Sequence, residues 1–190
     1  MERTYVVEKD FNKNDFTNRP LSMGDYEECK FNNCHFSNGD LSQLHFSDCV
    51  FTGCNLAMAK LNKTALQNCK FVDCKLTGLH FEACNPMLFS VSFEKCDLNL
   101  CSFYKLKMPK TNFNSSRLKD TDLAEADLSS AVFTNCDLEG AIFENTNLEK
   151  ADFQTAINFV IDPESNKIKG AKFTAGGLPG LLTKYQLEIN

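Results

Sequence analysis

A large apolar residue recurs at every fifth position over most of this 190-residue chain. The series begins at Phe11, is displaced once by two residues at Asn85-Pro86-Met87, resumes at Leu88 and continues to Phe153. A five-residue repeat matches neither the 3.6-residue period of an α-helix nor the two-residue alternation of a long strand. It is typical of a chain that turns a corner every five residues, so that four short sides close a square coil of about twenty residues.

The position two residues before each large residue favours small side chains, and the other three positions are mostly polar. We call the large residue the centre and the small one the slot. All ten cysteines are assigned to slots, and two series follow a spacing of twenty: Cys29, Cys49, Cys69 and Cys34, Cys54, Cys74. This spacing is independent support for the twenty-residue coil. We expect free thiols that serve as small core residues, because cysteines five residues apart match no zinc pattern.

The repeat predicts an all-β fold, a right-handed quadrilateral β-helix with a short C-terminal α-helix. Residues 1–8 are expected to form an N-terminal cap, and residues 9–175 the β-helix, with a register break at 85–87 and a loop near 162–166. Residues 176–190 are expected to form a helical segment, because a proline and apolar residues spaced i, i+3, i+4, i+7 indicate an amphipathic helix. Its apolar stripe either caps the rod or forms a homodimer contact: Leu178, Leu181, Leu182 and Tyr185.

No arrangement of residues typical of an enzyme, a metal site or a cofactor site is found in the sequence. His35, His45 and His80 each directly precede a centre and are expected to point outward. There is no phosphate-binding glycine loop and no metalloprotease motif. The N-terminus has no apolar signal region, and no apolar run is long enough to span a bilayer. We therefore expect a cytoplasmic protein that is not an enzyme and binds no metal, cofactor or membrane.

Charge is distributed unevenly along the chain. The net charge is −5, which argues against a broad nucleic-acid-binding surface. Residues 111–164 hold eleven acidic residues against three basic ones, whereas residues 1–110 are balanced. Repeated acids on a rigid rod resemble the regular charge of duplex DNA, although such a stretch also serves solubility alone. The expected partner-binding face comprises Asp120, Asp122, Glu125, Asp127, Asp137, Glu139, Glu144, Glu149 and Asp152.

The repeats resemble those of the pentapeptide repeat family, whose consensus reads A-(D/N)-(L/F)-x-x. Examples are Ala126-Asp127-Leu128, Ala151-Asp152-Phe153 and Cys136-Asp137-Leu138. The single displacement, the Cys-rich first half and the tail with Ile161-Asp162-Pro163 are similar to one branch of that family. This branch includes the Qnr quinolone-resistance proteins and the immunity proteins of albicidin and microcin producers.

In that branch the rod dimerises through its C-terminal helix and interacts with DNA gyrase or topoisomerase IV, partly as a DNA mimic. The resemblance therefore implies a bacterial protein that binds one of these enzymes and protects it from, or modulates its response to, quinolones or natural toxins. Qnr proteins interrupt their coils with longer loops, whereas only the excess at Asn85, Pro86 and Met87 is present here. The alternative is a protein-interaction scaffold with no topoisomerase target.

Overall fold

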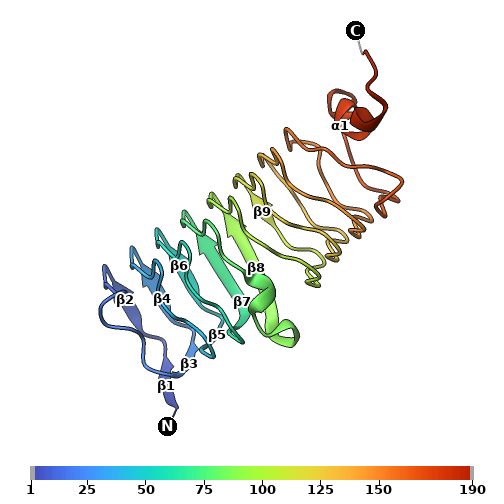
Figure 1. The fold of residues 1–190 in the computed structure, drawn as a ribbon. Coiled ribbons are helices and arrows are strands. Elements are labelled where there is room, and N and C mark those ends of the chain that lie inside the picture. The colour runs from blue at the N-terminus through green and yellow to red at the C-terminus, as the bar shows by residue number, and fades with distance from the viewer. Residues whose placement is uncertain (1–2, 189–190) are drawn as a thin grey trace.

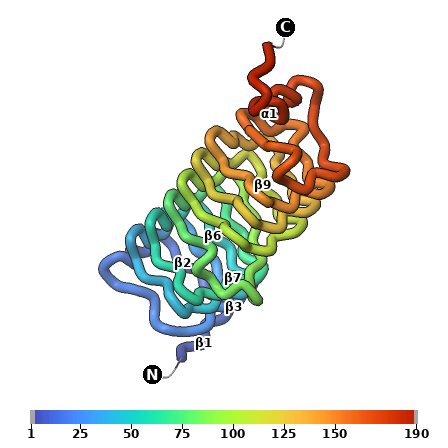
Figure 2. Tube along the Cα trace, turned by 45° about the vertical axis from the view of Figure 1, so that its right-hand side comes forward, coloured from blue at the N-terminus to red at the C-terminus, as the bar shows by residue number. Residues whose placement is uncertain are grey.

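The computed structural model describes residues 3–188, and these form a right-handed quadrilateral β-helix with its two chain ends at opposite ends of the rod (Figure 1). Successive coils stack in parallel, and the tube view shows the coils follow one another in chain order (Figure 2). The strands are short and lie mostly in the first half: β1 Thr4–Val7, β2 Asp10–Asn12, β3 Gly24–Glu27, β4 Lys30–Asn32, β5 His45–Ser47, β6 Val50–Thr52, β7 Ala65–Val72, β8 Phe89–Glu94 and β9 Phe113–Asn114.

Residues about twenty positions apart pair in parallel and form four columns, one for each side of the rod. Side 1 carries β2, β4 and β6 and continues through Asn112, Val132 and Asp152. Side 2 passes through Asp97, Arg117 and Asp137, and side 3 passes through Ser102, Asp122 and Ile142. Side 4 carries β1, β3 and β5 and continues through Lys107, Asp127 and Asn147. The four columns confirm the square coil that the five-residue period predicts.

The centres fill the inside of the rod as stacks of rings. Phe31 and Phe51 lie 4.6 Å apart with an interplanar angle of 6°, and the same side continues with Phe113, Phe133 and Phe153 at 5.0 and 4.7 Å. All five rings are essentially inaccessible to solvent. Because parallel coils place identical positions directly above one another, ring stacking follows from the repeat itself.

The slot residues also point inward, and the polar ones bind backbone carbonyl groups inside the rod. The hydroxyl of Thr64 donates to the carbonyl oxygen of Leu41 over 2.8 Å, and the Cys54 thiol donates to that of Phe31 over 3.2 Å. All ten cysteines are buried, and none forms a disulfide. A slot therefore suits a small side chain that either is apolar or carries one donor for a buried acceptor.

After most centres the chain turns at the second residue, which adopts a left-handed backbone conformation. Examples are Asn38 with φ of 56°, Asp73 with 53° and Gly140 with 69°. Asn, Asp and Gly tolerate this region best. The polar residues between the centres thus form the corners of the square.

The segment expected to form the N-terminal cap contains a strand of the β-helix. Residues 4–7 form β1, which pairs in register with β3, so this segment is the first side of the first coil. The backbone of this segment forms hydrogen bonds with the next coil. For example, the Thr4 amide donates to the Met23 carbonyl oxygen over 2.9 Å. The apolar pattern of this segment belongs to the repeat, because the same alternation suits a terminal strand and an internal one.

The register break lies near the expected residues, but the repeat resumes one residue later than expected. Phe71 pairs with Phe93, a separation of 22, whereas Leu66 pairs with Phe89. Phe89, rather than Leu88, packs against the core, with its ring 6.0 Å from that of Phe81. A single turn of 3₁₀-helix, Pro86–Leu88, contains the excess residues.

Candidate functional site

The nine candidate acids do not share one face, so the predicted single acidic face is wrong. Asp122, Asp127, Asp137 and Asp152 belong to the four different columns described above. The reason is geometric: successive five-residue repeats lie on successive sides, so an acidic stretch of sequence winds around the rod. The sequence predicted that this stretch is acidic, but it did not predict on which side of the rod each acid lies.

Four of the acids nevertheless gather where sides 3 and 4 meet, and we call this group the acidic corner: Asp122, Glu125, Asp127 and Glu144. The backbone amide of Glu125 donates to the carbonyl of Glu144 over 2.7 Å, which places these residues in adjacent coils. Within the part of the chain that the structure describes, the corner has one ion pair, between Glu125 and Lys105 at 3.3 Å. The Tyr104 hydroxyl group donates a hydrogen bond to the Glu125 carboxylate, and this bond and the charge of Lys105 lower the pKa of Glu125. Apart from this pair, no ion pair to a corner acid is found among the described residues.

The remaining five acids lie elsewhere, and two of them, Glu139 and Asp152, have a basic neighbour. Glu149 lies where sides 4 and 1 meet, because its carbonyl oxygen accepts the backbone amide of Ser130 in the preceding coil. Asp120 and Glu139 lie on side 2, joined by a 2.9 Å backbone hydrogen bond, and Glu139 pairs with Lys119 at 3.0 Å. Asp137 accepts a 2.8 Å hydrogen bond from the Asn158 side chain, and Asp152 lies 3.6 Å from the Lys172 ammonium group. The negative charge on side 2 is therefore partly neutralised by Lys119.

The aspartates directly before a centre also have a structural task that the sequence analysis missed. The Asp122 carboxylate accepts the backbone N–H of Ala124 over 3.0 Å, and Asp127 accepts that of Ser129 over the same distance. Asn147 does the same for Glu149 at 3.2 Å. These are Asx turns, which fasten the corner of each coil. The preference for Asp or Asn at this position was the signal, whereas the side chains of Glu125 and Glu144 take no part in these turns.

The three residues of the break form a small protrusion on the otherwise regular rod. The Asn85 side chain accepts the N–H of Met87 over 3.1 Å and so caps the 3₁₀ turn. Met87 is 90% exposed, the highest value among the large apolar residues described. Pro86 fixes the first residue of the turn. The protrusion thus presents one apolar side chain on a braced turn.

The C-terminal helix is much shorter than the expected segment 176–190. Helix α1 spans only Pro179–Leu182, between 3₁₀ turns at Ala175–Gly177 and Thr183–Tyr185. Residues 189–190 lie outside the described residues. The predicted stripe is accordingly divided: Leu181 packs against the core, Leu182 is half-buried, and Leu178 and Tyr185 are about half exposed.

Close packing against Phe159 explains why glycines stand at positions 177 and 180. A side chain at Gly180 would lie 2.3 Å from the Phe159 carbonyl oxygen, and one at Gly177 would lie 2.9 Å from its ring. The amide of Ile161 donates to the Gly180 carbonyl over 3.0 Å. Both glycines are required by this approach, and together with Phe159 they close the end of the rod.

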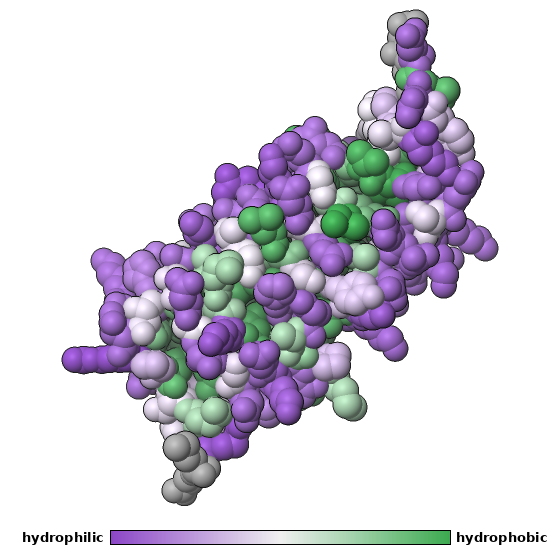
Figure 3. Space-filling model, in the orientation of Figure 1, coloured by the Kyte–Doolittle hydropathy of each residue, from purple (hydrophilic) through white to green (hydrophobic). Residues whose placement is uncertain are grey.

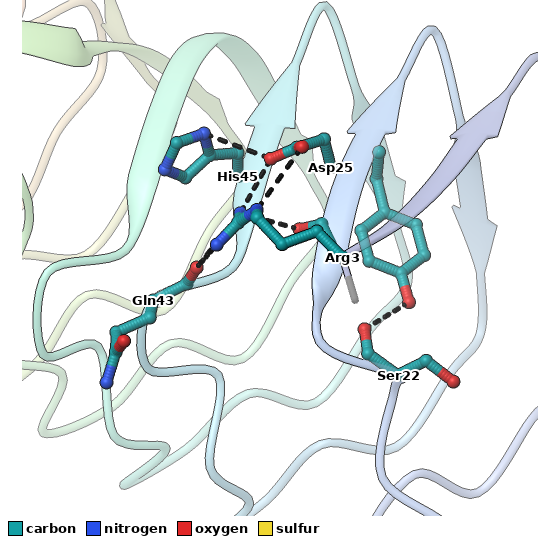
Figure 4. Close-up of polar contacts among 7 residues, drawn as sticks. Arg3, Ser22, Asp25, Gln43 and His45 are labelled. Atoms are coloured by element: carbon teal, nitrogen blue, oxygen red, sulfur yellow. Dashed lines mark hydrogen bonds and ion pairs between the residues drawn. The ribbon is translucent and has the colours of Figure 1, made fainter. Parts of the chain in front are cut away.

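The first strand is fastened by a charged cluster on side 4 (Figure 4). The Arg3 guanidinium donates to Asp25 over 2.6 Å and to the Gln43 carbonyl over 3.2 Å, and the Asp25 carboxylate also lies 3.1 Å from His45 Nδ1. The Arg3 hydrogen bond lowers the pKa of Asp25. Arg3 thereby links three coils. His35, His45 and His80 are all at the surface.

The hollows on the surface of the described residues are open ones. A hollow of about 430 Å³ lies beside Ile157 and Phe159 at the C-terminal end, and one of about 170 Å³ lies between Tyr5 and Leu88 on side 4. Within residues 3–188 no group of three or more His, Cys, Asp or Glu is arranged to hold a metal ion. None of the described helices is long and apolar enough to cross a bilayer. Figure 3 shows polar residues over most of one face, with apolar ones between them.

These features define a β-solenoid whose coils are built from four five-residue sides. A family model for the pentapeptide repeat region matches residues 24–87 and 80–153. The chain belongs to the pentapeptide repeat family.

Solved structures with the same fold include proteins of different function. QnrB1, a plasmid-mediated fluoroquinolone resistance protein, matches in a trypsin-treated form with a TM-score of 0.64 and 19% identity, over 99% of this chain and 98% of that one. HetL, involved in heterocyst differentiation regulation in the cyanobacterium Nostoc sp. strain PCC 7120, matches with a TM-score of 0.61 and 19% identity, over 88% and 81%. A search of curated protein sequences found no significant match. At these identities the likeness extends to the fold alone.

Proposed function

We propose that this protein binds a bacterial type II topoisomerase, DNA gyrase or topoisomerase IV, and protects it from, or modulates its response to, a topoisomerase poison. The acidic corner is the proposed contact surface. The observation that carries the proposal is that Glu125 and Glu144 lie in adjacent coils at one corner of a rigid rod, beside Asp122 and Asp127. Among the described residues, Lys105 alone forms an ion pair with this group.

A DNA-binding surface is the partner that this arrangement suits best. Coils stack about 4.8 Å apart, so the corner carries charge at intervals comparable with the phosphates of one DNA strand. A positively charged groove attracts such a rod from a distance and orients it. The fold shared with QnrB1 is consistent with a topoisomerase target. HetL shares the same fold and has a different role, so the fold alone does not identify the target.

The remaining sequence-derived surfaces have supporting roles in this proposal. The exposed apolar side chain of Met87, on the break protrusion, offers a second contact. It precedes the residues of the acidic corner in the sequence. The C-terminal residues Leu178, Leu181, Leu182 and Tyr185 are proposed to form a homodimer contact. Leu178 and Tyr185 are the most exposed of these and are the main candidates.

The decisive experiment measures supercoiling by purified gyrase, and decatenation by topoisomerase IV, with and without a fluoroquinolone and with increasing amounts of this protein. The proposal expects direct binding to at least one enzyme and a shift in the drug concentration that inhibits it. If the protein binds neither enzyme and changes neither the activity nor the drug response, the interaction-scaffold interpretation replaces it.

A further inference from the structure

The last described part of the chain is too short to hold its own conformation. We call residues 175–187 the C-terminal cap. Its one α-helical segment, Pro179–Leu182, is a single turn. Isolated helices of this length are not stable in water, because nucleation costs more than one turn of hydrogen bonds returns. The position of the cap therefore depends on contacts with the rod.

The first half of the cap is attached by apolar packing. Leu181 lies against the core, and Gly177 and Gly180 approach Phe159 closely. The hydrogen bond from Ile161 to the Gly180 carbonyl adds a backbone link. These contacts are insensitive to charge, and they end at Leu182.

The second half of the cap has no apolar attachment of this kind. Every side chain from Thr183 to Leu187 is exposed. Its side-chain links to the rod are polar: the Lys184 ammonium group lies 2.8 Å from Asp162 and 2.5 Å from Glu164, and the Tyr185 hydroxyl donates to Glu164 over 2.8 Å. Hydrogen bonds to Lys184 lower the pKa of both carboxyls, in line with this geometry.

We infer that Lys184 is a positioning residue: it clamps the second half of the cap to the loop Asp162–Glu164, so that the orientation of the cap is held by charge and is loosened by salt. Screening weakens exposed ion pairs, whereas it leaves the Phe159 contact unchanged. Insofar as the cap is the dimer contact of the proposed function, the clamp also regulates dimerisation by presenting Tyr185 and Leu187 in a fixed direction.

Hydrogen exchange of the Gln186 amide, which bonds to the Thr183 carbonyl over 3.1 Å, reports on the clamp directly. The variant Lys184→Met keeps most of the side-chain stem and removes the charge. The matched control is Lys172→Met, which removes the Asp152 ion pair on the rod but lies outside the cap. Each protein is measured at 0.1 and 1 M salt and at two protein concentrations. Protection that comes from dimerisation depends on protein concentration, so the two concentrations distinguish it from protection by the clamp.

We expect exchange at Gln186 to be about fivefold faster in Lys184→Met than in the wild type at 0.1 M salt. The wild type should approach the variant at 1 M salt, Lys172→Met should behave as the wild type, and Lys184→Arg should restore protection. Equal exchange in the wild type and Lys184→Met at low salt overturns the clamp, whatever the oligomeric state.

Sedimentation of the same proteins separates this inference from the proposed dimer. A loosened cap together with a lower dimer fraction supports both. A loosened cap in a protein that is monomeric throughout supports the clamp and removes the dimer contact from the proposed function.

Discussion

The thiol of Cys49 donates a hydrogen bond to the carbonyl oxygen of Tyr26, one coil earlier, over 3.2 Å. Burial raises the pKa of this thiol to about 12, and the same cause raises those of Cys84, Cys101 and Cys136 to about 12. Because the thiolate is the reactive form, these cysteines should react slowly in the native protein. Titration with a thiol reagent at pH 8 should give far fewer than ten equivalents before denaturation and ten after it. Ten fast-reacting thiols in the native protein contradict the inward slot assignment.

The same raised pKa values make the protein less stable in alkali. A thiol that titrates near pH 12 when folded and near 8.5 when unfolded releases its proton earlier in the unfolded state. The free energy of unfolding should therefore fall as pH rises from about 8.5 towards 12. Urea unfolding of the wild type and of Cys136→Ala, followed across this range, isolates one thiol. The variant should lose less stability on going to high pH, and an identical pH dependence refutes this explanation.

Phe71 stacks between Phe51 and Phe93, with ring centroids 4.9 and 5.6 Å away, and is 1% exposed. Replacement by Ala should cost about 3–5 kcal/mol of unfolding free energy, because it opens a cavity in a continuous stack. Tyr104→Ala is the control, since Tyr104 is an aromatic residue at the surface with 36% exposure. Chemical denaturation of both variants should separate them clearly, and a loss below about 1 kcal/mol for Phe71→Ala is inconsistent with the stack.

Leu100 occupies a left-handed corner position with φ of 60° and is 60% exposed, so it has neither a favourable backbone nor much burial. Asn tolerates this conformation better than Leu. Leu100→Asn should raise the unfolding free energy by up to about 1 kcal/mol. The β-branched variant Leu100→Val should lower it, because branching at Cβ worsens the left-handed conformation. Urea midpoints for the two variants should move in opposite directions.

The sequence predicted the interior of this rod well because the interior repeats. The five-residue period alone is enough to stack Phe31, Phe71 and Phe133 inside the rod, and the cysteine spacing identifies the coil length. Prediction failed where the chain departs from the repeat. Residues 4–7 have the apolar alternation of a cap and of a strand alike, so the β1 pairing with β3 could not be distinguished. At the break, Leu88 and Phe89 are both apolar, and only packing selects Phe89.

The candidate site was harder to predict, because the number of acidic residues in a stretch of sequence does not show which side of the rod each one occupies. The acidic stretch was evident, but its division between the corner that holds Glu144 and the side that holds Glu139 depends on which side of the coil each repeat occupies. Likewise, the stripe from Leu178 to Tyr185 predicted a longer helix than forms. The left-handed Gln186 and the close contact of Gly180 with Phe159 are tertiary features that local periodicity does not contain.

The central claim is that the acidic corner, rather than negative charge in general, binds a topoisomerase. The test variant reverses its two glutamates, Glu125→Lys and Glu144→Lys, and leaves the aspartates that form Asx turns intact. The control variant makes the same change in net charge elsewhere: Glu28→Lys and Glu139→Lys. All four side chains lie outside the core, so both variants should fold, which circular dichroism and thermal unfolding check.

The most direct measurement is binding of these proteins to gyrase, with wild type and both variants compared between 50 and 300 mM salt. Because screened electrostatic attraction weakens steeply with salt, wild-type affinity should fall over this range. The corner variant should lose binding, and the control should stay close to the wild type with the same salt dependence. Equal weakening of both folded variants, or wild-type affinity that does not change with salt, contradicts the account.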